Sequence, residues 1–105
     1  MSRGSDLEAD VIKLARMLRW KVAHWRSVPV KYNNRTVYQT PVQADGAGWP
    51  DMVCVRERIV FIECKSGSGR LSPEQKAWKA LLESTGAEYY VVGDDDLQDL
   101  AARLR

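Results

Sequence analysis

Two short apolar runs on either side of a charged turn constrain the fold of this chain more than any other feature. The runs occupy residues 52–55 and 59–65, and the turn between them is Arg56-Glu57-Arg58. Short apolar runs that are rich in Val and Ile and bounded by polar residues are typical of β-strands. We therefore predict a β-hairpin whose turn is centred near Glu57.

Elsewhere, apolar residues recur at the spacings of helices and strands. The helical spacing predicts helices over about residues 6–19, 72–86 and 94–105. Shorter apolar runs predict strands at residues 20–25 and 88–92. Helices and strands should therefore alternate along most of the chain.

The segment 27–48 interrupts this alternation. It contains two Pro, two Asn and two Gly, so it is predicted to be mostly loop, with residues 36–38 as a short extended piece. The resulting order of elements is α-β-β-β-α-β-α. We expect one α/β domain over residues 1–105, with a small mixed β-sheet flanked by helices. The composition, 45% apolar and 29% charged, is that of a globular domain.

Charge is distributed unevenly along the chain. Residues 1–79 carry 14 Lys and Arg against 8 Asp and Glu, whereas residues 80–105 carry 2 against 6. A basic body with an acidic end favours one surface that meets an anionic polymer. The alternative is a solvated surface of mixed charge.

The cysteines and the histidine exclude several kinds of site. Cys54 and Cys64 lie inside apolar runs, without CxxC spacing or a nearby His, which argues against a zinc site. His24 is the single histidine, so a His-based triad or metal cluster is not expected. We interpret His24 as structural, because it lies in an apolar and aromatic stretch.

Membrane and export signals are not recognisable in the sequence. No run approaches the roughly 18 apolar residues that a membrane helix requires. Residues 1–10 lack the apolar segment of a signal peptide. We therefore expect a cytoplasmic protein without membrane partners.

Two acids and a lysine are expected to converge at one end of the hairpin. Asp51 and Glu63 lie six residues on either side of Glu57, so the two carboxylates should face each other across the strands. Lys65 shares a strand face with Glu63, because alternate side chains point the same way. The alternative is an exposed Glu-Lys pair at a strand end, which would contribute little.

Such a group of charges has a plausible chemistry. Two carboxylates held close together repel each other unless a cation lies between them. Oxygen ligands are preferred by Mg²⁺ and Mn²⁺, and a bound metal can polarise a phosphoryl oxygen and activate a water molecule. Together with a lysine, these groups suit hydrolysis of a phosphodiester.

The same residues carry a family resemblance. The pattern Gly48-Trp49-Pro50-Asp51 followed by Glu63-Cys64-Lys65 resembles the PD-(D/E)xK nuclease superfamily and, within it, the virus-type replication-repair nuclease (VRR-NUC) domain. Gly46 and the helix start Ser72-Pro73-Glu74-Gln75 also match, and the resemblance extends over about residues 6–93. It implies a restriction-endonuclease-like fold.

The resemblance also implies a metal centre. Asp51, Glu63 and the backbone carbonyl of Cys64 would bind Mg²⁺ or Mn²⁺. Glu8, on the first helix, would reach the metal, directly or through water. Glu8 also follows Ser5 at the spacing of a helix capping box, so capping alone is an alternative explanation for it.

Two further residues acquire catalytic roles by resemblance. Lys65 would position the attacking water and the scissile phosphate, and Gln75 would support the site from the start of the second helix. Gln75 follows Ser72 at capping-box spacing, so here too capping alone is an alternative.

Basic residues outside the centre are candidates for contact with DNA phosphates. They are Arg70, Lys76, Lys79, Lys31 and Arg35. No segment resembles a base-reading helix, so we expect recognition of DNA shape. The alternative for each is a solvated surface charge.

The resemblance implies a metal-dependent DNA endonuclease, similar to Holliday-junction resolvases, that acts as a homodimer on branched DNA in phage or viral replication, recombination or repair. Its location would be the cytoplasm, that of a bacterial host if the chain is phage-encoded. One alternative is a flap or nicking nuclease working with a larger replication or packaging partner. The other is a non-catalytic DNA-binding module.

Overall fold

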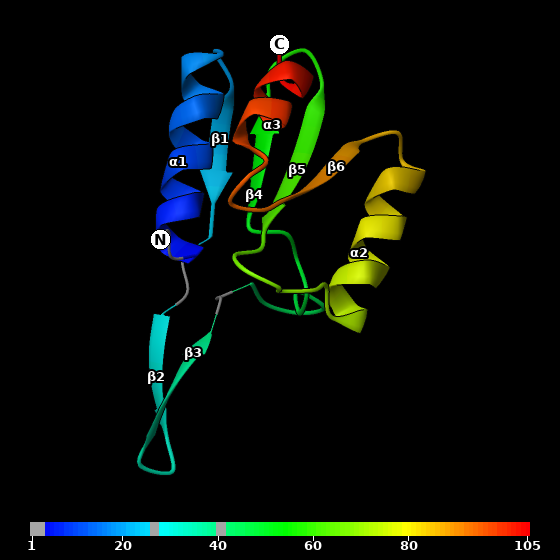
Figure 1. Cartoon of the computed structure of the whole chain (residues 1–105). Helices are drawn as coiled ribbons and strands as arrows, with labels where there is room; N and C mark the ends of the chain where they lie inside the picture. Colours follow the sequence, from blue (N-terminus) through cyan, green and yellow to red (C-terminus); the bar gives the residue numbers. More distant parts are fainter. Residues whose placement is uncertain (1–3, 26–27, 40–41) are drawn as a thin grey trace.

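A mixed four-stranded sheet in the order β1-β4-β5-β6 is the centre of the computed structural model, which describes residues 4–25, 28–39 and 42–105 (Figure 1). A second sheet has the two strands β2 and β3. Three helices complete the chain. In order, the elements are α1 (Gly4–Met17), β1 (Lys21–His24), β2 (Val28–Tyr32), β3 (Arg35–Gln39), β4 (Met52–Val55), β5 (Ile59–Cys64), α2 (Pro73–Ser84), β6 (Glu88–Val92) and α3 (Leu97–Arg103).

The hairpin predicted around Glu57 is confirmed. Strands β4 and β5 pair antiparallel, with Met52 opposite Ile62 and Val55 opposite Ile59. Strand β1 pairs antiparallel with β4, whereas β6 pairs parallel with β5. The α/β class and the mixed sheet flanked by helices are therefore confirmed.

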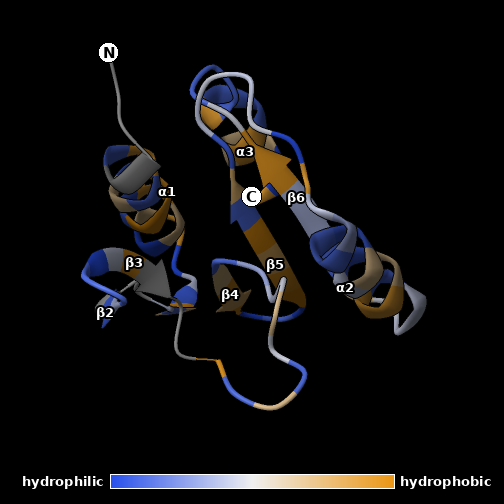
Figure 2. Ribbon diagram, turned by 90° about the horizontal axis from the view of Figure 1, so that it is seen from below, coloured by the Kyte–Doolittle hydropathy of each residue, from blue (hydrophilic) through white to orange (hydrophobic). Residues whose placement is uncertain are grey.

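The two faces of the sheet are covered by different helices. In Figures 1 and 2, α1 and α2 lie on opposite sides of β4 and β5. Residues from α1, α3 and one sheet face form the core, which includes Leu7, Val60 and Leu104. On the other face, Phe61 is 8% exposed. Strand β5 is thus covered on both faces, which explains its continuous apolar run.

Aromatic rings fill the space between the sheet and α2. Trp49, in the loop before β4, packs edge-to-face against Phe61 of β5 and against Trp78 of α2. Trp25, after β1, packs against Trp49 in the same manner. Such pairs stabilise beyond their buried area, so the loop, the sheet and the helix form one layer.

The helix boundaries are close to the predicted ones. Helix α1 is described from Gly4, two residues before its predicted start at about residue 6, which is within the usual variation of helix ends. Ser72 does cap α2, and Gly86 follows that helix with φ 90°. No helix in the described ranges has the length and apolar character needed to cross a membrane.

The prediction of a loop is wrong for residues 28–39 and right for residues 42–48, and the extended piece predicted at residues 36–38 lies within β3; residues 27, 40 and 41 lie outside the described residues. Strands β2 and β3 form a separate antiparallel hairpin, which adds two strands to the predicted order. Its two turn residues, Asn33 and Asn34, have φ of 50° and 61°. Asn accepts this left-handed conformation, which a two-residue hairpin turn requires. The Asn-Asn pair was therefore the overlooked signal.

Candidate active site

Asp51 and Glu63 meet at the end of the β4–β5 hairpin. The register that places Met52 opposite Ile62 brings the preceding acid across from the following one. The Asp51 side chain is also fixed by a backbone group, since the Cys64 N–H donates to its Oδ2 at 2.7 Å. The convergence of the two carboxylates expected from the hairpin register is therefore present.

The Glu63 carboxyl is unusual because it is an ionisable group that is almost completely buried. The residue is 2% exposed. Burial, followed by the neighbouring negative charge of Asp51, raises the pKa of Glu63 to about 8. Burial also raises the pKa of Asp51, against the Cys64 N–H hydrogen bond, which lowers it. The pair therefore retains a proton near neutral pH.

The two oxygens of Glu63 have different surroundings. Oε2 accepts a hydrogen bond from Gln75 Nε2 at 2.9 Å and lies 3.7 Å from Lys65 Nζ. Oε1 is buried, and no N–H or O–H donor among the described residues reaches it. The carboxylate next to Glu63 is that of Asp51, which is also an acceptor. An unpartnered buried carboxylate oxygen is costly, and a cation beside it would remove that cost. The donor set therefore fits a hard divalent metal ion.

Gln75 has both of the roles that were considered for it. Its backbone N–H donates to Ser72 Oγ at 3.2 Å, and its Oε1 accepts from the Ser72 N–H at 2.8 Å, which completes a capping box. The remaining amide group, Nε2, is the donor to Glu63. Capping thus orients the amide so that it reaches the buried acid.

Gly48 allows the loop before β4 to touch the start of α2. Its φ is 84°, and a Cβ built on it would lie 2.5 Å from the backbone carbon of Glu74 and 2.7 Å from the backbone nitrogen of Gln75. Only glycine fits such a close approach of two backbones. The glycine before Trp-Pro-Asp therefore brings the Asp51 loop and Gln75 together.

Glu8 lies close to the pair, on the first helix, α1. Its pKa is raised by burial and then by the charge of Asp51. Its Oε2 is 3.7 Å from Nε2 of His24 at the end of β1. The structure thus places His24, which we interpreted as structural, beside a candidate acid. Only the pairing of β1 with β4 shows this, because no spacing in the sequence links the two residues.

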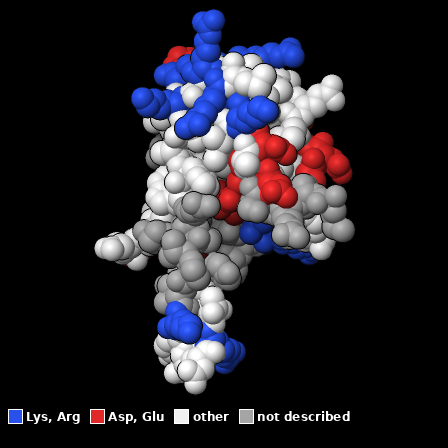
Figure 3. Space-filling model, turned by 90° about the vertical axis from the view of Figure 1, so that its left-hand side faces the viewer, with Lys and Arg blue, Asp and Glu red and all other residues white. Residues whose placement is uncertain are grey.

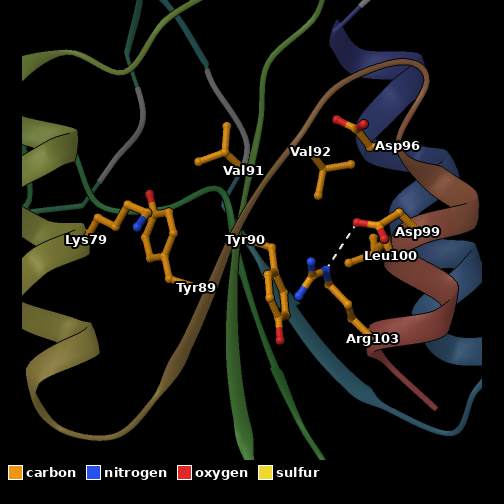
Figure 4. A pocket seen from close by; sticks show the side chains of 9 residues that line it. All are labelled: Lys79, Tyr89, Tyr90, Val91, Val92, Asp96, Asp99, Leu100 and Arg103. Carbon is orange, nitrogen blue, oxygen red and sulfur yellow. Dashed lines mark hydrogen bonds and ion pairs between the residues drawn. The ribbon is translucent and has the colours of Figure 1, made fainter.

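A cavity opens at this site. It has a volume of about 450 Å³, and its lining includes Gly48, Trp49, Asp51 and Gln75. Another cavity, of about 370 Å³, lies along β6 between α2 and α3, with Lys79, Tyr90 and Arg103 among its lining residues (Figure 4). The lining of the second cavity contains neither acid of the pair, so it is a separate feature.

The five basic residues proposed to contact DNA do not form one patch. Arg70 and Lys76 are exposed near the start of α2. Lys79 has other partners, because its Nζ lies 2.9 Å from Glu83 Oε1 and 5.6 Å from the centre of the Tyr89 ring. Lys31 and Arg35 are exposed on the separate β2–β3 hairpin.

Comparison with known protein families gives a match to the VRR-NUC domain over residues 15–95. This span is more than three quarters of the chain; it includes both acids of the pair, Lys65 and Gln75, whereas Glu8 lies before it. No significant match was found among curated proteins or among solved structures. The family match covers most of the chain, and the mixed α/β sheet is consistent with it. The chain therefore belongs to the VRR-NUC family of nuclease domains.

Proposed function

We propose that this nuclease domain is a metal-dependent DNA endonuclease that hydrolyses phosphodiester bonds in branched DNA. The observation that carries the proposal is the convergence of Asp51, Glu63 and Lys65, with one buried Glu63 oxygen that no donor among the described residues reaches. A structural ion pair would not require a second acid beside the first. A metal-dependent phosphodiester-cleaving centre can use both acids to hold the cation.

Asp51 and Glu63 would hold Mg²⁺ or Mn²⁺, together with the backbone carbonyl of Cys64, and Glu8 would act from α1. In the described part of the chain, no three His, Cys, Asp or Glu side chains are grouped tightly enough to hold a metal alone. Mg²⁺ commonly uses one or two carboxylates and keeps several waters, so the two acids suffice. When bound, the metal would supply Lewis-acid stabilisation of the phosphate and a more acidic water.

The remaining residues would position the reactants. Lys65 Nζ, 3.7 Å from Glu63 Oε2, lies where an ammonium can orient a water molecule and offset phosphate charge. Gln75 holds the Glu63 carboxylate in place through Nε2. The Cys64 N–H does the same for Asp51, so both acids are oriented before substrate arrives.

A homodimer would suit a branched substrate. A four-way junction needs two symmetric cuts, which a two-fold arrangement of one domain supplies. Strand β6 supports this idea, because its outer edge pairs with no described strand and its Val91 is 42% exposed.

We propose that the activity serves phage or viral replication, recombination or repair, in the cytoplasm of the cell in which the gene is expressed.

The test is cleavage of a labelled four-way junction, a flap and a linear duplex with Mg²⁺, Mn²⁺ or EDTA. Wild type should make symmetric, metal-dependent cuts in the junction, and Glu63→Ala should make none. Glu74→Gln is the matched control, since Glu74 is an exposed acid at the start of α2; it should cut like wild type.

The other outcomes separate the alternatives. Metal-dependent cutting of the flap in preference to the junction would favour a flap or nicking nuclease that works with a larger partner. Tight junction binding without any cutting by folded wild type would favour a non-catalytic DNA-binding module, and Glu63→Ala would then leave the affinity unchanged.

A further inference from the structure

The β2–β3 hairpin, residues 28–39 and hereafter the arm, projects from the body of the protein (Figure 1). All side chains of residues 31–37 are exposed. Its two strands pair with each other and with no other described strand. A two-stranded hairpin in water is marginally stable at best. The arm therefore has the character of an element that is completed by a partner.

The charge of the arm indicates an anionic partner. The arm contains Lys31 and Arg35 but no Asp or Glu, and it lies within the stretch 11–44, which has seven Lys and Arg and no acid. Figure 3 shows blue Lys and Arg atoms at the tip of the arm, whereas the red acids lie on the body above it. Exposed basic groups without acidic neighbours favour phosphates.

The arm is attached close to the candidate active site. The Trp25 N–H donates to the backbone carbonyl of Asp51 at 3.1 Å, and β2 begins three residues later. In Figure 1 the arm extends from the end of the sheet where β4 begins and β5 ends. With five residues in each strand, it reaches roughly 16 Å from its base. A substrate that runs along the arm from its tip to its base therefore extends toward the end of the sheet that carries Asp51.

The tip of the arm carries an exposed aromatic ring. Tyr32 is 69% exposed and pairs with Arg35 directly before the Asn33-Asn34 turn. An exposed ring of this kind has no role in the core of the protein. Aromatic rings stack on unpaired or splayed bases, and a two-stranded ribbon fits the major groove of DNA.

We infer that the arm binds the DNA substrate at its branch point, with Lys31 and Arg35 on phosphates and Tyr32 stacked on an exposed base. This inference rests on the proposed function, because it names the element that selects branched DNA for the Asp51–Glu63 centre. Linear duplex offers phosphates but no exposed base, so the arm would bind it less well than a junction or a flap.

The charge of the arm is tested by binding in EDTA, which separates binding from cutting. Junction affinity is measured as a function of salt for wild type, for Lys31→Ala with Arg35→Ala, and for Lys13→Ala with Arg16→Ala. The second pair lies exposed on α1 and removes the same charge from the same acid-free stretch. Loss of two phosphate contacts should lower the salt slope by about 1.8, at about 0.9 per contact. The α1 pair should lower it by less.

The aromatic ring is tested by Tyr32→Ala and Tyr32→Phe. The alanine variant should lose roughly tenfold in junction affinity but little in duplex affinity, whereas the phenylalanine variant keeps the ring and should bind like wild type. Equal effects of the two substitutions, or equal loss on junction and duplex, would overturn the stacking role.

Hydrogen exchange locates the contact directly. Amides of residues 28–39 should exchange rapidly in the free protein and become protected when a junction is added. Protection confined to other segments, or equal effects of the arm and α1 variants on the salt slope, would overturn the inference. Arm variants that turn a dimer into a monomer would also overturn it, in favour of an arm that binds a second copy. Failure of wild type to cut would count against the nuclease alone, because these readouts are all measured without metal.

Discussion

Gln75 on α2 donates a hydrogen bond from Nε2 to Oε2 of Glu63 on β5, at 2.9 Å. The bond joins the start of a helix to the most buried acid of the sheet. Because Oε1 of the same amide caps the helix through the Ser72 N–H, the orientation of the glutamine is set by local structure. The helix start therefore positions the Glu63 carboxylate.

The two roles of Gln75 should be separable by substitution. Gln75→Glu keeps an acceptor for the Ser72 N–H but removes the donor to Glu63 and adds a repelling charge. Hydrogen bonds to charged groups contribute about 1.5–3 kcal/mol, so DNA cleavage should fall roughly 10- to 100-fold. Ser72→Ala removes only a cap; it should destabilise the fold by about 1 kcal/mol and leave the cleavage rate of folded protein unchanged. The opposite pattern would show that Gln75 acts through capping alone.

Gly48→Ala should damage the site more than a glycine substitution elsewhere. The new Cβ would meet the backbone of Glu74 and Gln75 in addition to the strain of a positive φ. Gly86→Ala is the matched control, because Gly86 has φ 90° but open space around the position of a Cβ. Both should lose about 1 kcal/mol or more in free energy of unfolding by chemical denaturation. Only Gly48→Ala should also lose cleavage. If Gly48→Ala and Gly86→Ala lost DNA cleavage equally, the close approach of Gly48 to the backbone of Glu74 and Gln75 would not explain the loss.

Stability without metal should depend on pH through Glu63. The folded-state pKa, about 8, is above the ordinary value of 4.5, so the folded protein binds the proton more tightly than the unfolded chain does. The stabilising effect of this proton is therefore fully present below about pH 4.5 and is lost as the pH rises through about 8. In EDTA, Glu63→Gln should melt well above wild type at pH 8.5 and close to it at pH 4.5. Glu74→Gln should follow wild type throughout.

Addition of Mg²⁺ should reverse this pH effect in wild type. A cation that takes the place of the proton stabilises the folded state, and it competes with fewer protons at high pH. The rise in melting temperature with Mg²⁺ should be larger at pH 8.5 than at pH 6 and should be absent in Glu63→Gln. An equal rise in both proteins would place the bound metal elsewhere.

The last helix should matter for stability more than for chemistry. Leu104 is fully buried, and its carbonyl accepts a hydrogen bond from Trp20 Nε1 at 2.8 Å. Leu104→Ala should lower the free energy of unfolding by about 2–5 kcal/mol. Leu81→Ala, at a position 59% exposed on α2, should change it by less than about 0.5 kcal/mol. A Leu104→Ala protein that is fully folded but cannot cut DNA would contradict this separation.

Local features were predictable from the sequence because near neighbours determine them. The β4–β5 register follows from two apolar runs and a short turn, and it suffices to place Asp51 near Glu63. The cap at Ser72 follows from the spacing of its partners. The arm was also predictable in principle, since Asn33 and Asn34 lie between two extended segments, but its Pro and Gly neighbours favoured a loop.

The sequence by itself determined the acids, the lysine and the hairpin pairing that brings them together, because side-chain alternation and hairpin register act over a few residues. Only the tertiary structure decided that Gln75 reaches Glu63, that Glu8 and His24 lie beside Asp51, and that the arm extends from the same end of the sheet. Each of these contacts joins separate elements. They depend on how helices pack on the two faces of the sheet and on a close backbone approach at Gly48, which no local pattern encodes.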